Sequence, residues 1–323
     1  MRVTQAILFA AFVALAANGP ALAQETADSV AAGGLVVGGQ GVELASHELF
    51  VSRDAIRSRY VFRNRGGSDV TLPVSFPLQD RSSLRHVREL RWPGEVRIMV
   101  DGRDPALQPE RRALLRDVDH TELLTRLGVP LLYWDAAWEP AQRALLALPL
   151  EEQARLAGLG LVEIFAPVNG PRQLTPLWTI REHWQWLQVF PAGRDLVVEH
   201  SYAPGLAGSI NVGMSSDAIR NSEYGQEQIR RFCLDDSYLA GMDRLGGGDA
   251  MHSVAETMLT FTFAGAPSPI GDFRLVVDRG EAGNAVGFCG EAVQAIGPTQ
   301  VEMRRTNWQP QGEIQFIFLA PEG

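Results

Sequence analysis

A change of hydrophobic period inside the chain limits its possible folds more than any other feature of the sequence. Before residue 105, strand-like segments such as Ser58 to Arg63 and Val70 to Phe76 alternate or nearly alternate apolar and polar residues. Between residues 105 and 160 the period becomes 3.6, and strand-like segments return from residue 161 onward. The pattern predicts a mainly β fold, with an antiparallel β-sandwich-like core and a helical insert at 105–160.

Turn residues between the strand-like segments predict two β-hairpins. Asn64 to Asp69 separates the strands 58–63 and 70–76, and Pro191 to Asp195 separates the strands 178–190 and 196–202. Pairing within the second hairpin would place His183 and His200 on one face, diagonal to each other. No acidic residue lies two positions from either histidine on that face, so we predict no metal site.

The insert carries its own start and stop residues. Pro109 and Pro140 suit first helical turns, and Asp119 with Glu122 three residues later predicts a capping box. Capping explains the acidic residues near His120 better than a metal site does. The leucines of the insert are expected to pack it onto the sheet. The polar stretch 205–226 has no periodicity and is expected to be a functional or mobile loop.

The N-terminus has the anatomy of a cleavable export signal, predicted at residues 1–23. Arg2 is followed by the apolar run Ala6 to Ala17 and by the small residues Ala21 and Ala23. The apolar run is too short to span a bilayer, so no stable membrane insertion is expected after cleavage. We predict a periplasmic or secreted protein, with residues 24–323 forming one composite β-rich domain that contains the insert.

Charge and composition exclude several classes of function. The formal net charge is −9, which opposes binding to nucleic acid. All 29 basic residues are arginines, so chemistry that requires a lysine is absent. No cofactor is predicted.

Two cysteines, Cys233 and Cys289, are the only ones in the chain. They are even in number, occur in a chain predicted to be exported, and lack a CxxC spacing. We therefore predict one disulfide bond between them.

Tryptophans form the most suggestive cluster of candidate binding residues. Trp134 and Trp138 lie four residues apart in the insert, and Trp184 and Trp186 share one face of a predicted strand. Exposed, they would stack on a sugar ring or an extended peptide; buried, they would form the seam between insert and sheet. Tryptophan is usually largely buried, which favours the seam.

No catalytic residue is identified. The chain contains no GxSxG, SxxK or HExxH motif, and Ser201 and His200 are adjacent on a strand and so point to opposite faces. We expect a non-enzymatic cell-envelope protein that binds or scaffolds an envelope protein or a glycan. Two alternatives stay open, a carbohydrate-binding module with a tryptophan platform and a hydrolase with a non-local catalytic triad.

Several phrases spread over the mature chain resemble the bacterial domain-of-unknown-function 4424 family of exported proteins. The most informative are Tyr60 to Asn64, Phe190 to Gly193, Phe232 to Asp235 and Phe288 to Gly290. Their order and spacing carry the resemblance, with arginine in place of the family's lysines at Arg194 and Arg279. The resemblance implies an exported β-rich protein with a helical insert and a cysteine pair, and it implies no activity.

Overall fold

The computed structural model describes most of the chain after the predicted export signal, which lies outside the described residues. The described ranges are 30–38, 41–78, 80–82, 89–91, 96–133, 135–167, 170–209, 215–246, 254–263, 269–310 and 312–321. The fold is mainly β, as predicted, with sheets that are antiparallel apart from two parallel strand pairs.

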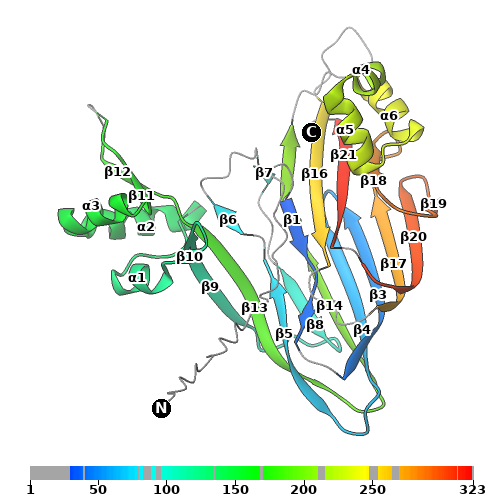
Figure 1. Cartoon of the computed structure of the whole chain (residues 1–323), viewed down its shortest axis with the longest axis horizontal. Coiled ribbons are helices and arrows are strands. Elements are labelled where there is room, and N and C mark those ends of the chain that lie inside the picture. Colours follow the sequence, from blue (N-terminus) through cyan, green and yellow to red (C-terminus); the bar gives the residue numbers. More distant parts are fainter. Residues whose placement is uncertain are drawn as a thin grey trace, which may run out of the picture.

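Sheet I has seven strands and forms one layer of a β-sandwich (Figure 1). In order across the sheet they are β19 (Gln294–Ala295), β20 (Gln300–Trp308), β17 (Ile270–Asp278), β3 (Val42–Ser52), β4 (Ile56–Asn64), β14 (Asp195–Tyr202) and β8 (Arg97–Val100). β3 and β17 are parallel although far apart in sequence, so the N-terminal and C-terminal parts of the chain meet in this sheet. Inward side chains of β4 alternate with outward ones, as the sequence pattern predicts.

Sheet II lies between sheet I and a layer of helices. Its strands run β18 (Ala285–Phe288), β21 (Glu313–Pro321), β16 (Val254–Thr262), β15 (Leu206–Ser209) and β7 (Glu89–Arg91), with β1 (Val30–Gly33) parallel to β16. Nearly every residue of β16 is buried because the strand is covered on both faces. Phe261 packs toward sheet I, whereas Met258 packs toward the helices.

The helical layer over sheet II consists of α4 (Ser216–Asn221), α5 (Glu223–Phe232) and α6 (Asp236–Gly246). Two of these helices begin at serine caps, since the Ser215 and Ser222 hydroxyls accept the backbone N–H groups of Ala218 and Gly225. The stretch expected to be an irregular loop is therefore partly helical. The predicted disulfide is present between Cys233, at the end of α5, and Cys289, just after β18. None of the described helices is both long and apolar enough to cross a membrane.

Sheet III lies beside sheet II and also faces sheet I. Its order is β10 (Val118–Asp119), β9 (Gln108–Leu115), β13 (Thr179–Phe190), β5 (Val70–Pro77) and β2 (Val36–Val37), with β6 (Arg81–Ser82) also paired to β13. The long strands β9 and β13 leave the sandwich together as a ribbon (Figure 1). The expected helix start at Pro109 is wrong, because Pro109 lies within β9 and pairs opposite Trp184.

The far end of this ribbon carries a compact unit that we call the head (Figure 1). It contains α1 (Thr121–Arg126), η1 (Asp135–Ala137), α2 (Trp138–Ala147), α3 (Leu150–Gly158) and the hairpin of β11 (Val162–Phe165) with β12 (Gln173–Pro176). Leu124, Leu145 and Leu156 are fully buried in a core of the head, with Ala113 and Ile180 of the ribbon. The insert leucines thus pack onto the ribbon's end and not onto the sandwich, while Leu146 is 41% exposed.

The first helix of the head begins one residue later than the predicted capping box would place it. His120 occupies the N-cap position and makes no side-chain capping bond. The Asp119 carboxylate instead accepts the backbone N–H of Thr121, and hydrogen bonds from Thr121 lower the pKa of Asp119. The acidic group next to His120 is therefore engaged by the chain itself, as expected for a helix start.

Both predicted hairpins are wrong in their pairing, although their strands are present. β4 belongs to sheet I and β5 to sheet III, and β13 and β14 are divided between the same two sheets. The turns therefore carry the chain from one sheet to the other, and they lie side by side at one corner of the sandwich (Figure 1). Turn composition predicts a change of direction, but the choice of partner strand depends on the core.

Asn64 joins the two turns at this corner. Its side chain is buried and donates hydrogen bonds from Nδ2 to the carbonyl oxygens of Ser68 and Phe190, each at 2.9 Å. Its Oδ1 accepts the backbone N–H of Gly66 at 2.8 Å. Asp69 in turn accepts the backbone N–H of Ala192 at 2.9 Å. The polar groups of the two turns thus form hydrogen bonds with each other across the corner, as buried polar groups generally do.

Candidate functional site

Strand β13 runs through two hydrophobic cores, and the region between them is the candidate site. Ile180, near its start, is buried in the head core. Trp186 and Phe190, near its end, are buried in the sandwich core among residues of sheets I, II and III. The base of the insert is therefore the place where a single strand connects two packed units.

The last part of β13 has an open edge. β9 pairs with β13 from Thr179 to Gln185, whereas β5 pairs with it as far as Phe190. Among the described strands, none continues beside β13 on the β9 side beyond Gln185. Because an unpaired strand edge presents backbone donors and acceptors, this edge can accept another strand.

Prolines in the neighbouring strands determine which backbone groups face the open edge. Pro73 and Pro77 of β5 lie opposite Leu187 and His183, and Pro109 of β9 lies opposite Trp184. Since proline has no N–H, these are the non-hydrogen-bonded pairs of the antiparallel ladders. The backbone N–H and C=O of Leu187 therefore point away from β5 and toward the open edge.

A cleft of about 600 Å³, which we call the junction cleft, lies along this edge. Its walls include Pro73, Pro105, Gln185, Trp186, Leu187 and Gln188. Leu187 is 75% exposed, a high value for a leucine in a sheet strand. The cleft combines apolar rings and side chains with amides that both donate and accept hydrogen bonds.

The glutamine amides of the cleft are held in defined orientations. Gln188 donates from Nε2 to the Val189 carbonyl at 2.8 Å, and its Oε1 accepts the Trp186 indole N–H at 3.1 Å. The Val189 carbonyl is therefore already satisfied. Leu187 is left as the residue whose N–H and C=O both face the cleft.

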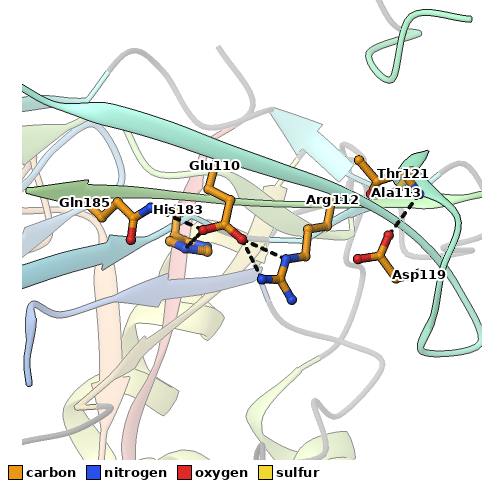
Figure 2. Close-up of polar contacts among 7 residues, drawn as sticks. All are labelled: Glu110, Arg112, Ala113, Asp119, Thr121, His183 and Gln185. Carbon is orange, nitrogen blue, oxygen red and sulfur yellow. Dashed lines mark hydrogen bonds and ion pairs between the residues drawn. The ribbon is translucent and has the colours of Figure 1, made fainter. Parts of the chain in front are cut away.

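The ribbon is fixed just before the open edge by a polar cluster around Glu110. Figure 2 shows the Glu110 carboxylate contacted by Arg112, His183 and Gln185. His183 Nε2 and Gln185 Nε2 lie 3.1 Å and 3.2 Å from Glu110 Oε2. The hydrogen bond from Arg112 is the largest cause of the lowered pKa of Glu110, and the charge of His183 adds to it. This cluster orients the Gln185 side chain at the mouth of the cleft.

The tryptophans predicted to form one binding or packing cluster are distributed over the molecule. Trp134 lies outside the described residues. Trp138 is half-buried at the start of α2 in the head, and Trp184 is half-buried on β13. Trp186, on the same face of β13, is buried in the sandwich core. The structure therefore brings only Trp184 and Trp186 onto one strand.

A different aromatic pair builds the interior of the head. Trp178 is fully buried, its indole N–H donates to the Leu131 carbonyl at 2.8 Å, and its ring meets Tyr133 edge-on at 5.2 Å between centroids. The insert thus has an aromatic anchor, but it lies inside the head and not between head and sandwich.

The two candidate histidines are also separated. His183 belongs to the half-buried Glu110 cluster, whereas His200 is buried in the sandwich core beside Tyr60, Phe76 and Tyr202. Desolvation lowers the pKa of His200 to about 3. The expectation that they share a face is wrong, because their strands belong to different sheets. In the part of the chain that the structure covers, no three His, Cys, Asp or Glu residues gather as metal ligands would.

Sequence reasoning missed the junction cleft, because its existence depends on where β9 stops pairing. One feature of the sequence could have indicated it. Pro73, Pro77 and Pro109 lie in strand-like or strand-forming segments, and proline inside a strand indicates a place where ladder hydrogen bonds are absent.

Comparisons with known proteins place the chain in a family without a described activity. The model of the DUF4424 family, a domain of unknown function, matches residues 23–317. No curated protein matches the sequence.

Solved structures show only a distant likeness. A candidate nutrient-binding protein from Legionella pneumophila aligns at 9% identity over 90% of this chain and 71% of its own, with a TM-score of 0.43. An M1 zinc metallopeptidase from Deinococcus radiodurans aligns at 8% identity over 87% of this chain and 43% of its own, with a TM-score of 0.23. At such low scores neither likeness carries an argument about activity. The family match covers nearly the whole chain, and this protein is a member of the DUF4424 family.

Proposed function

We propose that this protein is an exported, non-enzymatic binding protein of the cell envelope, and that it holds an extended polypeptide segment in the junction cleft. The observation that carries the proposal is the open edge of β13, where the backbone of Leu187 faces a cleft of about 600 Å³. Addition of a strand to an exposed sheet edge is a common mode of peptide recognition.

The bound segment would continue the line of β9 along β13. Its backbone would exchange hydrogen bonds with the N–H and C=O of Leu187, which supplies affinity with little dependence on sequence. Successive side chains of an added strand point to opposite faces. Half of them would therefore lie on the face of Trp186 and Gln188. The others would meet the exposed side chains of Leu187 and Val189.

The placement of the candidate residues supports peptide binding over the two alternatives. A sugar platform needs an exposed ring face, and Trp186 is only 7% exposed. A hydrolase needs a histidine that reaches a nucleophile, but His200 points into the core while Ser201 lies on the outer face of the same strand. An envelope protein with an extended segment is therefore the partner we propose.

Two substitutions at Leu187 test the proposal, because they separate its backbone from its side chain. Leu187→Pro removes the N–H that faces the cleft, and it breaks no described ladder bond since this residue is not hydrogen-bonded to β5. Leu187→Thr shortens the apolar side chain and keeps the N–H. Peptides of ten residues selected from a random display library with the wild-type protein would then be titrated against both variants.

We expect Leu187→Pro to weaken binding of the selected peptides about tenfold or more. A tenfold loss corresponds to about 1.4 kcal/mol of binding free energy, which is the size expected for one lost backbone hydrogen bond. Leu187→Thr should retain most of the affinity. Equal binding by both variants, or failure to select any peptide that wild-type protein binds reversibly, would reject strand addition at this edge.

A further inference from the structure

A second hollow lies on the outer face of sheet I, away from the junction cleft. It encloses about 600 Å³ over β3, β4, β8, β14 and β17. Its lining includes four arginines and two glutamates, namely Arg57, Arg59, Arg97, Arg274, Glu48 and Glu199. The hollow is therefore net positive, whereas the whole chain carries a formal charge of −9. A local excess of cations in an acidic protein requires a physical explanation.

The register of the sheet places two of these arginines on either side of a serine. Arg57 of β4 pairs opposite Ser201 of β14, and Ser201 pairs opposite Arg97 of β8. Side chains directly opposite each other on neighbouring strands lie about 5 Å apart at Cβ and project from the same face. The small Ser201 side chain leaves room between two long cationic ones.

The row that holds Ser201 has one carboxylate, that of Glu302 at its far side, and Arg274 and Arg304 already pair with it. Continuing across the sheet from Arg57, the partners are Phe50, Val276 and then Glu302. The Arg57 guanidinium lies 4.0 Å from the centroid of the Phe50 ring, a cation–π contact that steadies the group, and Arg57 also interacts electrostatically with Asp278. Arg97 makes no ion pair with any residue that the structure describes.

In the neighbouring row of the same sheet, the arginines have carboxylate partners. Arg59 lies between Glu48 and Glu199, at 4.0 Å and 3.8 Å. Arg274 donates to Glu302 at 2.6 Å. The charges of that row are largely compensated, and the cationic excess is concentrated on Arg57 and Arg97.

We propose that Arg57, Ser201 and Arg97 form a binding site for a small oxyanion, a phosphate or carboxylate group. Two guanidinium groups and a hydroxyl can all donate hydrogen bonds to a charged acceptor placed between them, and guanidinium matches both anions in a bidentate geometry. The free oxyanion and the same group at the end of a larger ligand would use the same contacts. The site shares no residue with the junction cleft, so it stands whether or not the peptide proposal does.

Calorimetric titration of the full chain tests the site, with inorganic phosphate in one arm and citrate in the other, in a buffer without other oxyanions. We expect saturable binding in at least one arm, and the stronger arm identifies the preferred group. Arg97→Gln and Arg57→Gln should each weaken that binding about tenfold, the loss expected for one charge-assisted hydrogen bond. The matched control is Arg126→Gln, which removes an exposed arginine of the head.

A third substitution fills the site from within the chain. Ser201→Glu places a carboxylate between the two arginines, and it should abolish oxyanion binding while raising the midpoint of thermal unfolding. Absence of saturable binding in both arms would overturn the proposal. So would an equal loss of binding in the Arg126→Gln variant, because that result would mean diffuse attraction to positive charge.

Discussion

The sandwich and the head are built on the same strand, yet they bury different kinds of residue. The sandwich core joins three sheets and contains stacked aromatic rings together with the buried histidines His47 and His200. The head core is rich in leucine and contains Trp178 as its largest side chain. The two cores are separate clusters linked through the β9 and β13 ribbon.

This difference indicates where stability and binding reside. Each core can hold its own part of β13 in place, one at Ile180 and the other at Phe190. The open edge at Leu187 lies beside the sandwich core and at the base of the ribbon, so it is supported by packed residues on its inner face. A binding edge on a rigid strand is better defined than one on a loop.

Large-to-small substitutions in each core are the strongest test of whether the two units unfold separately. Phe316→Ala empties a fully buried position in the sandwich, and Trp178→Ala does so in the head. Each should cost about 3–5 kcal/mol of unfolding free energy. Calorimetry of the wild-type protein should resolve two transitions, and each variant should lower a different one.

A single transition that both substitutions lower equally would contradict this expectation. It would instead agree with the one composite domain that the sequence predicts for residues 24–323.

The strands could be predicted from sequence better than their partners could. The predicted strands in these regions correspond closely to β4 (Ile56–Asn64) and β14 (Asp195–Tyr202). Their alternating patterns were readable because one face of each strand is buried. Their pairing with each other was not predictable from turn residues, since the same Gly, Pro and Asn chemistry serves hairpins and corners. Gln108–Leu115 contains good helix formers, and its pairing with β13 overrides that local preference.

The candidate sites were predictable only in part for the same reason. The prolines that shape the junction cleft are visible in the sequence, but the residue at which β9 stops pairing is not. Arg57, Ser201 and Arg97 are separated by more than 100 positions at the extremes, and only the register of sheet I places them in one row. Propensity and spacing describe single strands, whereas these sites depend on contacts between strands.

Removal of the disulfide should lower the stability of the sandwich and leave that of the head unchanged. Cys233–Cys289 closes a separation of 56 residues between α5 and the end of β18, within the sandwich and its helical layer. Replacing both cysteines by serine should lower the stability of that unit by about 2–4 kcal/mol. The sandwich transition should shift in calorimetry while the head transition stays in place. A matching shift of the head transition would show that the two units unfold together.

Acid should also destabilise the sandwich selectively, through its buried histidines. Burial lowers the pKa of His200 to about 3, and burial together with the charge of His200 lowers the pKa of His47. Above pH about 6.5 both rings are neutral in the folded and unfolded states. As the pH falls below that value, the unfolded chain gains protons that the folded core excludes. The sandwich should lose stability by about 1.4 kcal/mol per pH unit for each histidine.

His200→Leu should make this pH dependence shallower by about 1.4 kcal/mol per unit between pH 6.5 and 4.5, as measured by denaturant unfolding at each pH. Glu256, whose raised pKa acts in the opposite direction, is present in both proteins and cancels in the comparison. An unchanged slope in His200→Leu would mean that this ring is protonated without opening the core.

The smallest effect is expected at the ion pairs along the ribbon, which test how firmly the two units are coupled. Arg111 donates to the Glu182 carboxylate at 2.7 Å across β9 and β13. The arginine is 39% exposed, so water screens the pair, and a double-mutant cycle with Arg111→Gln and Glu182→Gln should give a coupling energy below about 1 kcal/mol. High salt should reduce even that value. A coupling of several kcal/mol would mean that side chains hold head and sandwich in a fixed relation. A weak coupling leaves the backbone ladder of the ribbon as their connection, and the edge at Leu187 then depends on the sandwich core alone.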